Sequence, residues 1–199
     1  MTVYAEVGVT TNFSFLRGAS YPQEYVHRAS KYGLYAVGIA DHNTLSGVVR
    51  AYSEFGNKEK VRYKPKLLVG TRLVFSDDTP DILAYPSDRE SYGRLCRLLT
   101  EGKLRGEKGE CHLWLDDLLR FSCGLLLIVI PPYRIANKKI LNVISALGRS
   151  QADGIWLAAS MFYRGDDERR LALLQKIATT ARVPLIATND TLYHIPQRR

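Results

Sequence analysis

The fold is decided within residues 9–52, which read VTTNFSFLRGASYPQEYVHRASKYGLYAVGIADHNTLSGVVRAY. The apolar run Val3–Thr10, which leads into this stretch, has the composition of a strand. Pro22 predicts the first turn of a helix, where its missing N–H is no loss, and Gly33 is placed to end that helix in the left-handed conformation. A second strand is expected at Tyr35–Ala40. Strand, helix and strand in this order predict a βα unit, in which the two strands run parallel.

The same alternation of strand-like and helical patterns continues along the chain. The remaining strands are expected at Lys66–Phe75, Ile82–Tyr85, Gly124–Ile130, Asp153–Ala159 and Pro184–Thr188, and the remaining helices at Leu45–Phe55, Asp88–Leu104, Trp114–Phe121, Ile135–Leu147 and Asp166–Ala181. Gly56 stands where the second helix ends. No Pro-, Gly- or Ser-rich linker interrupts the series. A chain of 199 residues can bury one proper core, so we expect residues 1–199 to form a single domain, a closed or nearly closed (β/α) barrel around a parallel sheet.

The composition indicates a soluble protein of the reducing cytosol. The net charge of +8 is compatible with a polyanionic partner such as DNA, but the basic residues are scattered, which is typical of a solvated surface. Cys96, Cys111 and Cys123 are odd in number and lack CxxC spacing, so they predict neither a disulfide framework nor a zinc knuckle. The longest apolar stretch, residues 124–132, is too short to cross a bilayer, and no secretory leader pattern is present. We expect a cytoplasmic location and no membrane contact.

Polar residues follow several predicted strands, at the edge where the loops of a βα fold converge. Asp41 and His42 follow the second strand, and Asp190 follows the last one. A carboxylate and an imidazole at converging strand ends can hold a metal ion or supply a general base. A structural role is also open: Asp41 or Asn43 can cap the helix that follows. Similarly, Asp190 or Asn189 can accept hydrogen bonds from loop amides.

Four segments carry a resemblance to a known family. They are, in chain order, NFSFLRGAS (residues 12–20), DHNTLSGVVRA (41–51), DRESYGRLCRLLTEGK (88–103) and PLIATNDTLYHIPQRR (184–199). Their sequence and order resemble the PHP (polymerase and histidinol phosphatase) domain at the N-terminus of bacterial error-prone DNA polymerases, which are related to the replicative alpha subunit. The resemblance spans essentially the whole chain. It implies a distorted seven-stranded (β/α) barrel, and it implies that the chain is the N-terminal fragment of a much longer polymerase.

The resemblance also indicates which site residues have been lost. Active PHP domains hold several divalent ions, commonly zinc or manganese, and hydrolyse phosphoesters with metal-bound water. Aligned with that family, Gly8 and Thr10 stand at the positions of a His-x-His pair. Arg17 and Arg72 stand where acidic residues are usual, and Leu192 replaces a histidine. No side chain in this set can replace the ligand it displaces, and a permanently charged arginine opposes a metal cation.

Few of the family's ligands remain. His42 and Asp190 match the family, and Asp81 stands where a histidine is common. Together with Asp41, which directly precedes His42, they are the expected vestigial metal-site positions. We expect no bound metal, or one weakly bound divalent ion at His42 and Asp190, because so few ligands cannot hold a multinuclear cluster. His194 stands two residues beyond Leu192, where it could point toward the same edge, but a surface position is expected.

The resemblance therefore implies a degenerate PHP domain that acts as a structural scaffold in a polymerase for damage-tolerant DNA synthesis. No intact catalytic residue and no tightly bound cofactor are expected in this chain, and the Mg²⁺ ions of nucleotidyl transfer belong to the absent polymerase core. The implied partners are the remainder of the polymerase chain and, through it, DNA. Two alternatives remain open. One is a residual metal-dependent phosphoesterase or exonuclease that uses His42, Asp81 and Asp190, and the other is a stand-alone module that binds nucleic acid or a polymerase.

Overall fold

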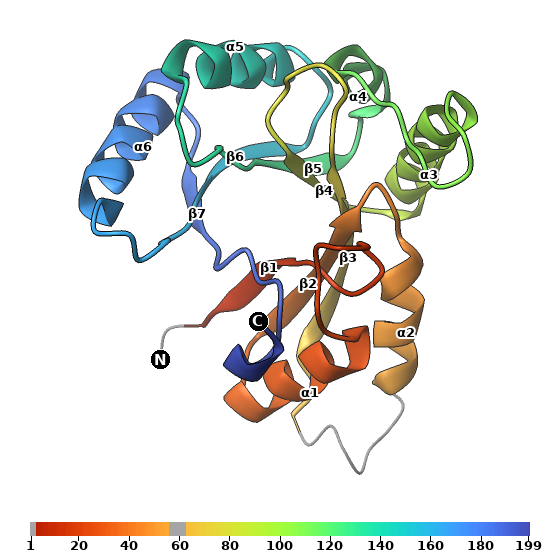
Figure 1. Ribbon diagram of the computed structural model, residues 1–199. Coiled ribbons are helices and arrows are strands. Elements are labelled where there is room, and N and C mark those ends of the chain that lie inside the picture. Colours follow the sequence, from red (N-terminus) through yellow and green to blue (C-terminus); the bar gives the residue numbers. More distant parts are fainter. Residues whose placement is uncertain (1–2, 56–62) are drawn as a thin grey trace. The chain divides into compact units, whose positions relative to one another are not determined.

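The computed structural model describes residues 3–55 and 63–199 (Figure 1). Its elements are, in order, β1 (Ala5–Val9), α1 (Pro22–Tyr32), β2 (Ala36–His42), α2 (Ser46–Glu54), β3 (Lys66–Leu73), β4 (Ile82–Pro86), α3 (Arg89–Leu104), α4 (Leu115–Phe121), β5 (Leu125–Val129), α5 (Asn137–Gly148), β6 (Gly154–Ala159), α6 (Asp167–Ala181), β7 (Leu185–Ala187) and the short 3-10 helix η1 (Pro196–Arg198). Every predicted strand and helix is present, with ends shifted by two residues or fewer. The predicted helix end at Gly56 lies outside the described residues. Within the described ranges, no helix combines the length and the apolarity needed to cross a bilayer.

The chain divides into two compact units. The first contains Met1–Arg72 and Thr188–Arg199, and the second contains Leu73–Ala187. The strands follow sequence order in the sheet, as β1-β2-β3 in the first unit and β4-β5-β6-β7 in the second. β1, β2 and β3 run parallel to one another, and so do β5, β6 and β7. The single domain over residues 1–199 stays a prediction.

The predicted parallel sheet is wrong at β4. This strand pairs antiparallel with β5, with Ile82 opposite Val129 and Pro86 opposite Leu125. A parallel connection needs a crossover of about a dozen residues or more, usually with a helix. Residues 87–124, which join β4 to β5, contain α3 and α4 and are long enough for such a crossover, so the length of the connection does not decide the direction of this pair. With this antiparallel pair, the strands form a mixed sheet.

The core of the first unit lies between its two helices and strands β1 and β2. Val26 of α1, Ala51 of α2 and Ile39 of β2 are fully buried there. α1 begins at Pro22 and ends at Gly33, whose φ of 64° is left-handed, and both ends are as predicted. Because β1, β2 and β3 are parallel, this packing places their carboxyl ends at one edge of the sheet.

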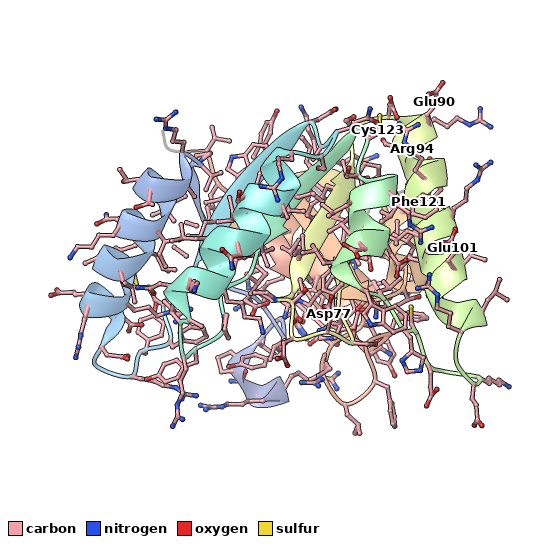
Figure 2. The ribbon with its side chains drawn as sticks, turned by 90° about the horizontal axis from the view of Figure 1, so that it is seen from above. Asp77, Glu90, Arg94, Glu101, Phe121 and Cys123 are labelled. Carbon is pink, nitrogen blue, oxygen red and sulfur yellow. The ribbon has the colours of Figure 1, made fainter. Side chains whose placement is uncertain are left out.

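In the second unit, a nearly buried carboxylate holds the start of α4. Asp117 accepts two hydrogen bonds from Arg105, at 2.5 and 2.9 Å, and one from the amide of Trp114 at 3.0 Å. The hydrogen bonds from Arg105 lower the pKa of Asp117 to about 2. Arg94 of α3 donates at 2.8 Å to the carbonyl of Cys123, which follows α4 (Figure 2). Arginine side chains thus connect α3 to both ends of α4.

Candidate functional site

The carboxyl end of β1 lies beside the segment 188–192 in the first unit. The amide of Thr191 donates to the carbonyl of Gly8 at 2.7 Å, and the amide of Thr10 donates to the carbonyl of Thr191 at 2.9 Å. These bonds join the two ends of the described chain at the edge where β2 and β3 also end. The predicted site residues found in this unit are Gly8, Thr10, Arg17, Asp41, His42, Arg72, Asp190 and Leu192.

Asp41 is the centre of a buried hydrogen-bond network. Its carboxylate accepts bonds from the amide and the hydroxyl of Thr11, both at 2.8 Å, and from the hydroxyl of Ser14 at 2.7 Å. Ser14 in turn accepts a bond from the amide of His42 at 2.9 Å. Burial raises the pKa of Asp41, and the bonds from Ser14 and Thr11 act against that rise. The helix-cap alternative is wrong, because Leu45 is the N-cap residue of α2 and no side-chain cap bond is present there among the described residues.

Arg72 and Asp190 form an ion pair at this edge. The Arg72 side chain is 7% exposed and that of Asp190 is 21% exposed. Arg72 is also the register partner of His42 between β3 and β2. Burial, followed by the positive charges of Arg72 and Arg17, lowers the pKa of His42 to about 4, so this imidazole is neutral at neutral pH. In the ion pair, the negative charge of Asp190 is balanced by the positive charge of Arg72.

Glu6 is a member of the site that sequence reasoning missed. Its carboxylate is almost fully buried and accepts hydrogen bonds from the Tyr4 hydroxyl at 2.7 Å, the Gly8 amide at 2.9 Å and the Thr188 hydroxyl at 2.6 Å. The amide and the side-chain nitrogen of Asn189 also donate to it, both at 3.0 Å. Burial and the charge of Glu6 raise the pKa of Tyr4. A glutamate inside the otherwise apolar strand AEVGV was the available signal, because a buried charge needs partners.

The residues at this edge do not fit the metal cluster that the resemblance implies. A Cβ atom added at Gly8 would lie 2.6 Å from the Thr188 hydroxyl and 3.3 Å from the Asp190 Cα, so a histidine has no room there unless its neighbours move. Thr10 is fully buried, and its hydroxyl has no hydrogen-bond partner within the part of the chain that the structure describes. Across residues 3–55 and 63–199, no group of three or more His, Cys, Asp or Glu side chains is placed to hold an ion. A stable zinc site needs three or four such ligands.

The other predicted residues have different environments. Asp81 belongs to the second unit rather than to the first. Leu192 is 40% exposed, and Arg17 is exposed. The prediction that His194 lies at the surface is wrong, because its side chain is only 14% exposed and its ring forms a hydrogen bond of 2.8 Å with the Ser20 hydroxyl.

Comparison with known proteins identifies relatives over the whole chain. The chain is 62% identical over 196 residues to an error-prone DNA polymerase from Rhodopseudomonas palustris (strain BisB5), a match that covers 98% of this chain and 18% of that protein. It is 47% identical over 197 residues to an error-prone DNA polymerase from Caulobacter vibrioides, with 99% of this chain and 18% of that protein covered. The chain thus spans about a fifth of the length of these relatives.

Solved structures share the fold at low sequence identity. One is a crystal structure described as a metal-dependent phosphoesterase from Bifidobacterium adolescentis, with a TM-score of 0.65, 16% identity, and coverage of 98% of this chain and 89% of that one. Another is an amidohydrolase from Chromobacterium violaceum with bound sulfate and no metal, with a TM-score of 0.67, 16% identity, and coverage of 96% and 88%. The predicted seven-stranded α/β fold is confirmed. The PHP domain profile matches residues 7–144, and the chain therefore belongs to the PHP domain family.

Proposed function

We propose that this PHP domain is a non-hydrolytic scaffold within an error-prone DNA polymerase that carries out damage-tolerant synthesis. The similarity to error-prone polymerases over 98–99% of the chain supports this assignment. The remainder of such a polymerase is then the domain's direct partner. Mg²⁺-dependent nucleotidyl transfer and DNA binding at the primer end belong to that remainder, and the protein works in the cytoplasm.

The ion pair between Arg72 and Asp190 is the observation that carries the scaffold role. Asp190, which the resemblance predicts to be a remaining family ligand, is bound to a buried guanidinium. A metal ion at the same carboxylate has to displace this cation or approach it closely, and at 4 Å two unit charges repel by about 4 kcal/mol at the effective dielectric near a protein surface. The pair therefore disfavours metal binding and holds β3 to the segment after β7.

The hydrogen bonds to the Glu6 carboxylate of β1 support the same role. Its donors are Tyr4 and Gly8, which are close to it in sequence, and Thr188 and Asn189, which are more than 180 positions away along the chain. Hydrogen bonds to a charged group contribute about 1.5–3 kcal/mol each, and leaving a buried charge without them is costly. These hydrogen bonds therefore hold β1 to the segment that follows β7.

Hydrolysis measurements test this proposal. The purified chain is assayed with bis-p-nitrophenyl phosphate and with a short single-stranded DNA in the presence of Zn²⁺ or Mn²⁺. We expect hydrolysis no faster than that of a variant with both His42→Gln and Asp190→Asn. Hydrolysis that needs added metal and is lost in this double variant would instead establish the residual phosphoesterase that uses His42, Asp81 and Asp190.

A full-length polymerase that contains this domain provides the matching positive test. Arg72→Met in that protein should lower its melting temperature while leaving primer extension per folded molecule unchanged. A loss of extension rate without a loss of stability would contradict the scaffold role.

A further inference from the structure

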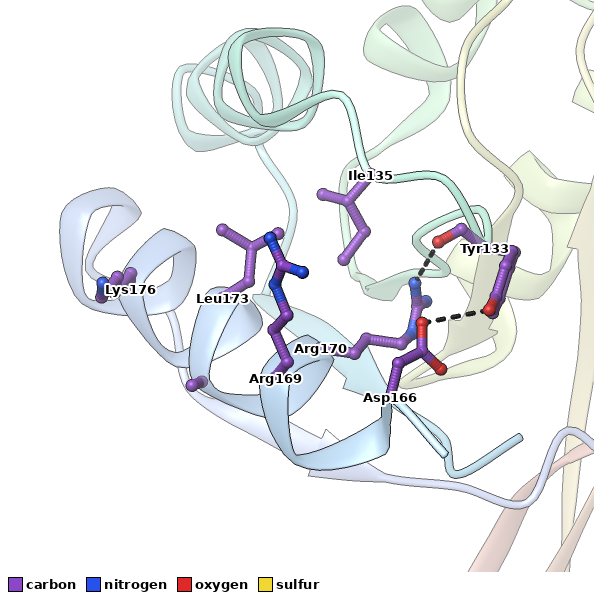
Figure 3. A pocket seen from close by; sticks show the side chains of 8 residues that line it. Tyr133, Ile135, Asp166, Arg169, Arg170, Leu173 and Lys176 are labelled. Atoms are coloured by element: carbon purple, nitrogen blue, oxygen red, sulfur yellow. Dashed lines mark hydrogen bonds between the residues drawn. The ribbon is translucent and has the colours of Figure 1, made fainter. Parts of the chain in front are cut away.

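A pocket lies in the second unit, between the segment that leads into α5 and the first turns of α6 (Figure 3). Its volume is about 410 Å³, within the range of about 300–1,000 Å³ that is usual for small-ligand sites. Its lining residues are Tyr133, Ile135, Asp166, Arg169, Arg170, Ala172, Leu173 and Lys176. None of them belongs to the edge that contains Arg72 and Asp190, so the pocket needs an explanation of its own.

One face of α6 provides the pocket with cationic side chains. Arg169, Leu173 and Lys176 stand four and three residues apart, which places them on the same side of a helix. Arg169 and Lys176 are exposed, and neither forms an ion pair within the described part of the chain. Two cations with an apolar residue between them are therefore open to an anionic ligand.

A buried arginine forms the inner wall of the pocket. Arg170 is only 6% exposed, and its guanidinium donates to the carbonyls of Pro131, Pro132 and Tyr133 at 3.1, 3.0 and 2.7 Å. Its Nε has no hydrogen-bond partner among the residues that the structure describes. This nitrogen is buried, so it is not available to a ligand at the pocket surface. The three hydrogen bonds to consecutive carbonyls fix the position of this wall.

The carboxylates at the start of α6 are used to hold aromatic residues. Asp166 accepts a hydrogen bond from the Tyr133 hydroxyl at 3.0 Å. Asp167 accepts bonds from the backbone amides of Phe162 and Tyr163 at 2.8 and 2.9 Å. Asp166 and Asp167 therefore hold the aromatic end of the pocket, Glu168 of the same turn is exposed, and the two cations lie further along α6.

Exposed aromatic rings complete the surface. Tyr133 is 41% exposed, Phe162 36% and Tyr163 89%, and the rings of Tyr133 and Phe162 pack edge to face at 5.7 Å. The guanidinium of Arg164 lies 4.6 Å from the centre of the Tyr133 ring. Exposed rings and stacked guanidinium groups are the platforms on which unpaired bases stack, and neighbouring Lys and Arg side chains bind the phosphates.

We propose that this pocket binds single-stranded nucleic acid, with a base stacked at Tyr133 and Arg164 and the adjacent phosphates bound by Arg169 and Lys176. An inorganic phosphate uses the cations but leaves the rings without a role, and an acidic peptide does the same. The proposal is independent of the scaffold role, because it concerns different residues and a different unit of the chain.

Fluorescence anisotropy of a labelled oligothymidylate 12-mer titrated with the chain tests the proposal at two salt concentrations. The double variant Arg169→Ala/Lys176→Ala should bind more weakly. The slope of log K against log salt should also decrease in magnitude by about 1.4, because two phosphate contacts are lost and each contributes about 0.7 on a single strand. The matched control is Arg97→Ala/Lys103→Ala, which removes the same charge from exposed positions of α3. The control should reduce affinity much less.

Tyr133→Leu separates stacking from charge. Loss of one stacked base weakens single-strand binding by roughly fivefold or more, whereas Tyr133→Phe keeps the ring and should bind as the parent chain does. Circular dichroism verifies that each variant is folded. Equal losses in the two charge-removal pairs, or a polyglutamate peptide that competes as well as an unlabelled oligothymidylate, would overturn the proposal. Failure of the parent chain to bind at low salt would do so as well.

Discussion

Removing the guanidinium of Arg72 should destabilise the chain only as long as Asp190 keeps its charge. Breaking a buried ion pair by removing one partner costs about 3–5 kcal/mol. Asp190 is 21% exposed, so water can solvate part of the freed charge, and we expect Arg72→Met to cost about 2–3 kcal/mol. Asp190→Asn should cost about 1–2 kcal/mol. Asparagine is the suitable replacement, because position 190 has a φ of 49° and asparagine tolerates this left-handed conformation.

The double variant carries the test of this reasoning. Once the carboxylate charge is gone, removing the guanidinium breaks no ion pair, so the stability lost in the double variant should be at least ~1 kcal/mol smaller than the sum of the two single losses. Urea unfolding followed by circular dichroism gives the three free energies, provided that the slopes with urea agree. Additivity within ~0.5 kcal/mol would refute a stabilising ion pair between Arg72 and Asp190.

Three further predictions concern other parts of the chain. Glu6→Gln replaces one carboxylate oxygen by an NH₂ group, which cannot accept the hydrogen bonds donated there, and should lower the free energy of unfolding by roughly 2–4 kcal/mol. Thermal melts measure this loss, and an unchanged melting temperature would contradict the network. Gly8→His should destabilise the chain, because the Thr188 hydroxyl is the nearest obstacle to a side chain at position 8. Thr188→Ala removes a hydrogen bond to Glu6, so it should lower the melting temperature of the parent chain, and it should lower that of Gly8→His by less; equal decreases in the two backgrounds would show that the crowding is unimportant. The folded-state pKa of Asp117 is about 2, below the ordinary value of about 3.9, so its pairing stabilises the fold above about pH 4 and is lost as the pH falls toward 2. The stability gap between the parent and Asp117→Asn should close over that range, and a gap independent of pH would contradict it.

Local signals in the sequence predict most of the secondary structure. Pro22 and Gly33 mark the ends of α1 because each has a backbone preference that acts without tertiary context. The direction of β4 depends on how its strand is connected and paired, and an apolar run such as Ile82–Tyr85 is compatible with either direction. The mixed sheet could therefore be found only from the structure.

The sequence predicted which positions along the chain belong to the site, but not which of these residues bind one another. The ends of the strands were correctly identified as polar, and Arg72 was singled out as a cation where a carboxylate is usual. Its partner Asp190 lies 118 positions away, and the donors of Glu6 at Thr188 and Asn189 lie still further. No local pattern indicates such pairs, because they depend on how the chain closes on itself. The assignment of His42 and Asp190 as remaining metal ligands stays a prediction.

The metal content of the purified chain tests the central claim most directly. The chain is dialysed with excess Zn²⁺ or Mn²⁺, then against buffer without metal, and the bound metal is counted by inductively coupled plasma mass spectrometry. The account predicts far less than one ion per chain, with no difference between the parent and a variant that carries both His42→Gln and Asp190→Asn. One or more tightly held ions per chain, lost in that variant, would contradict the claim that the protein's own cation has replaced the metal site.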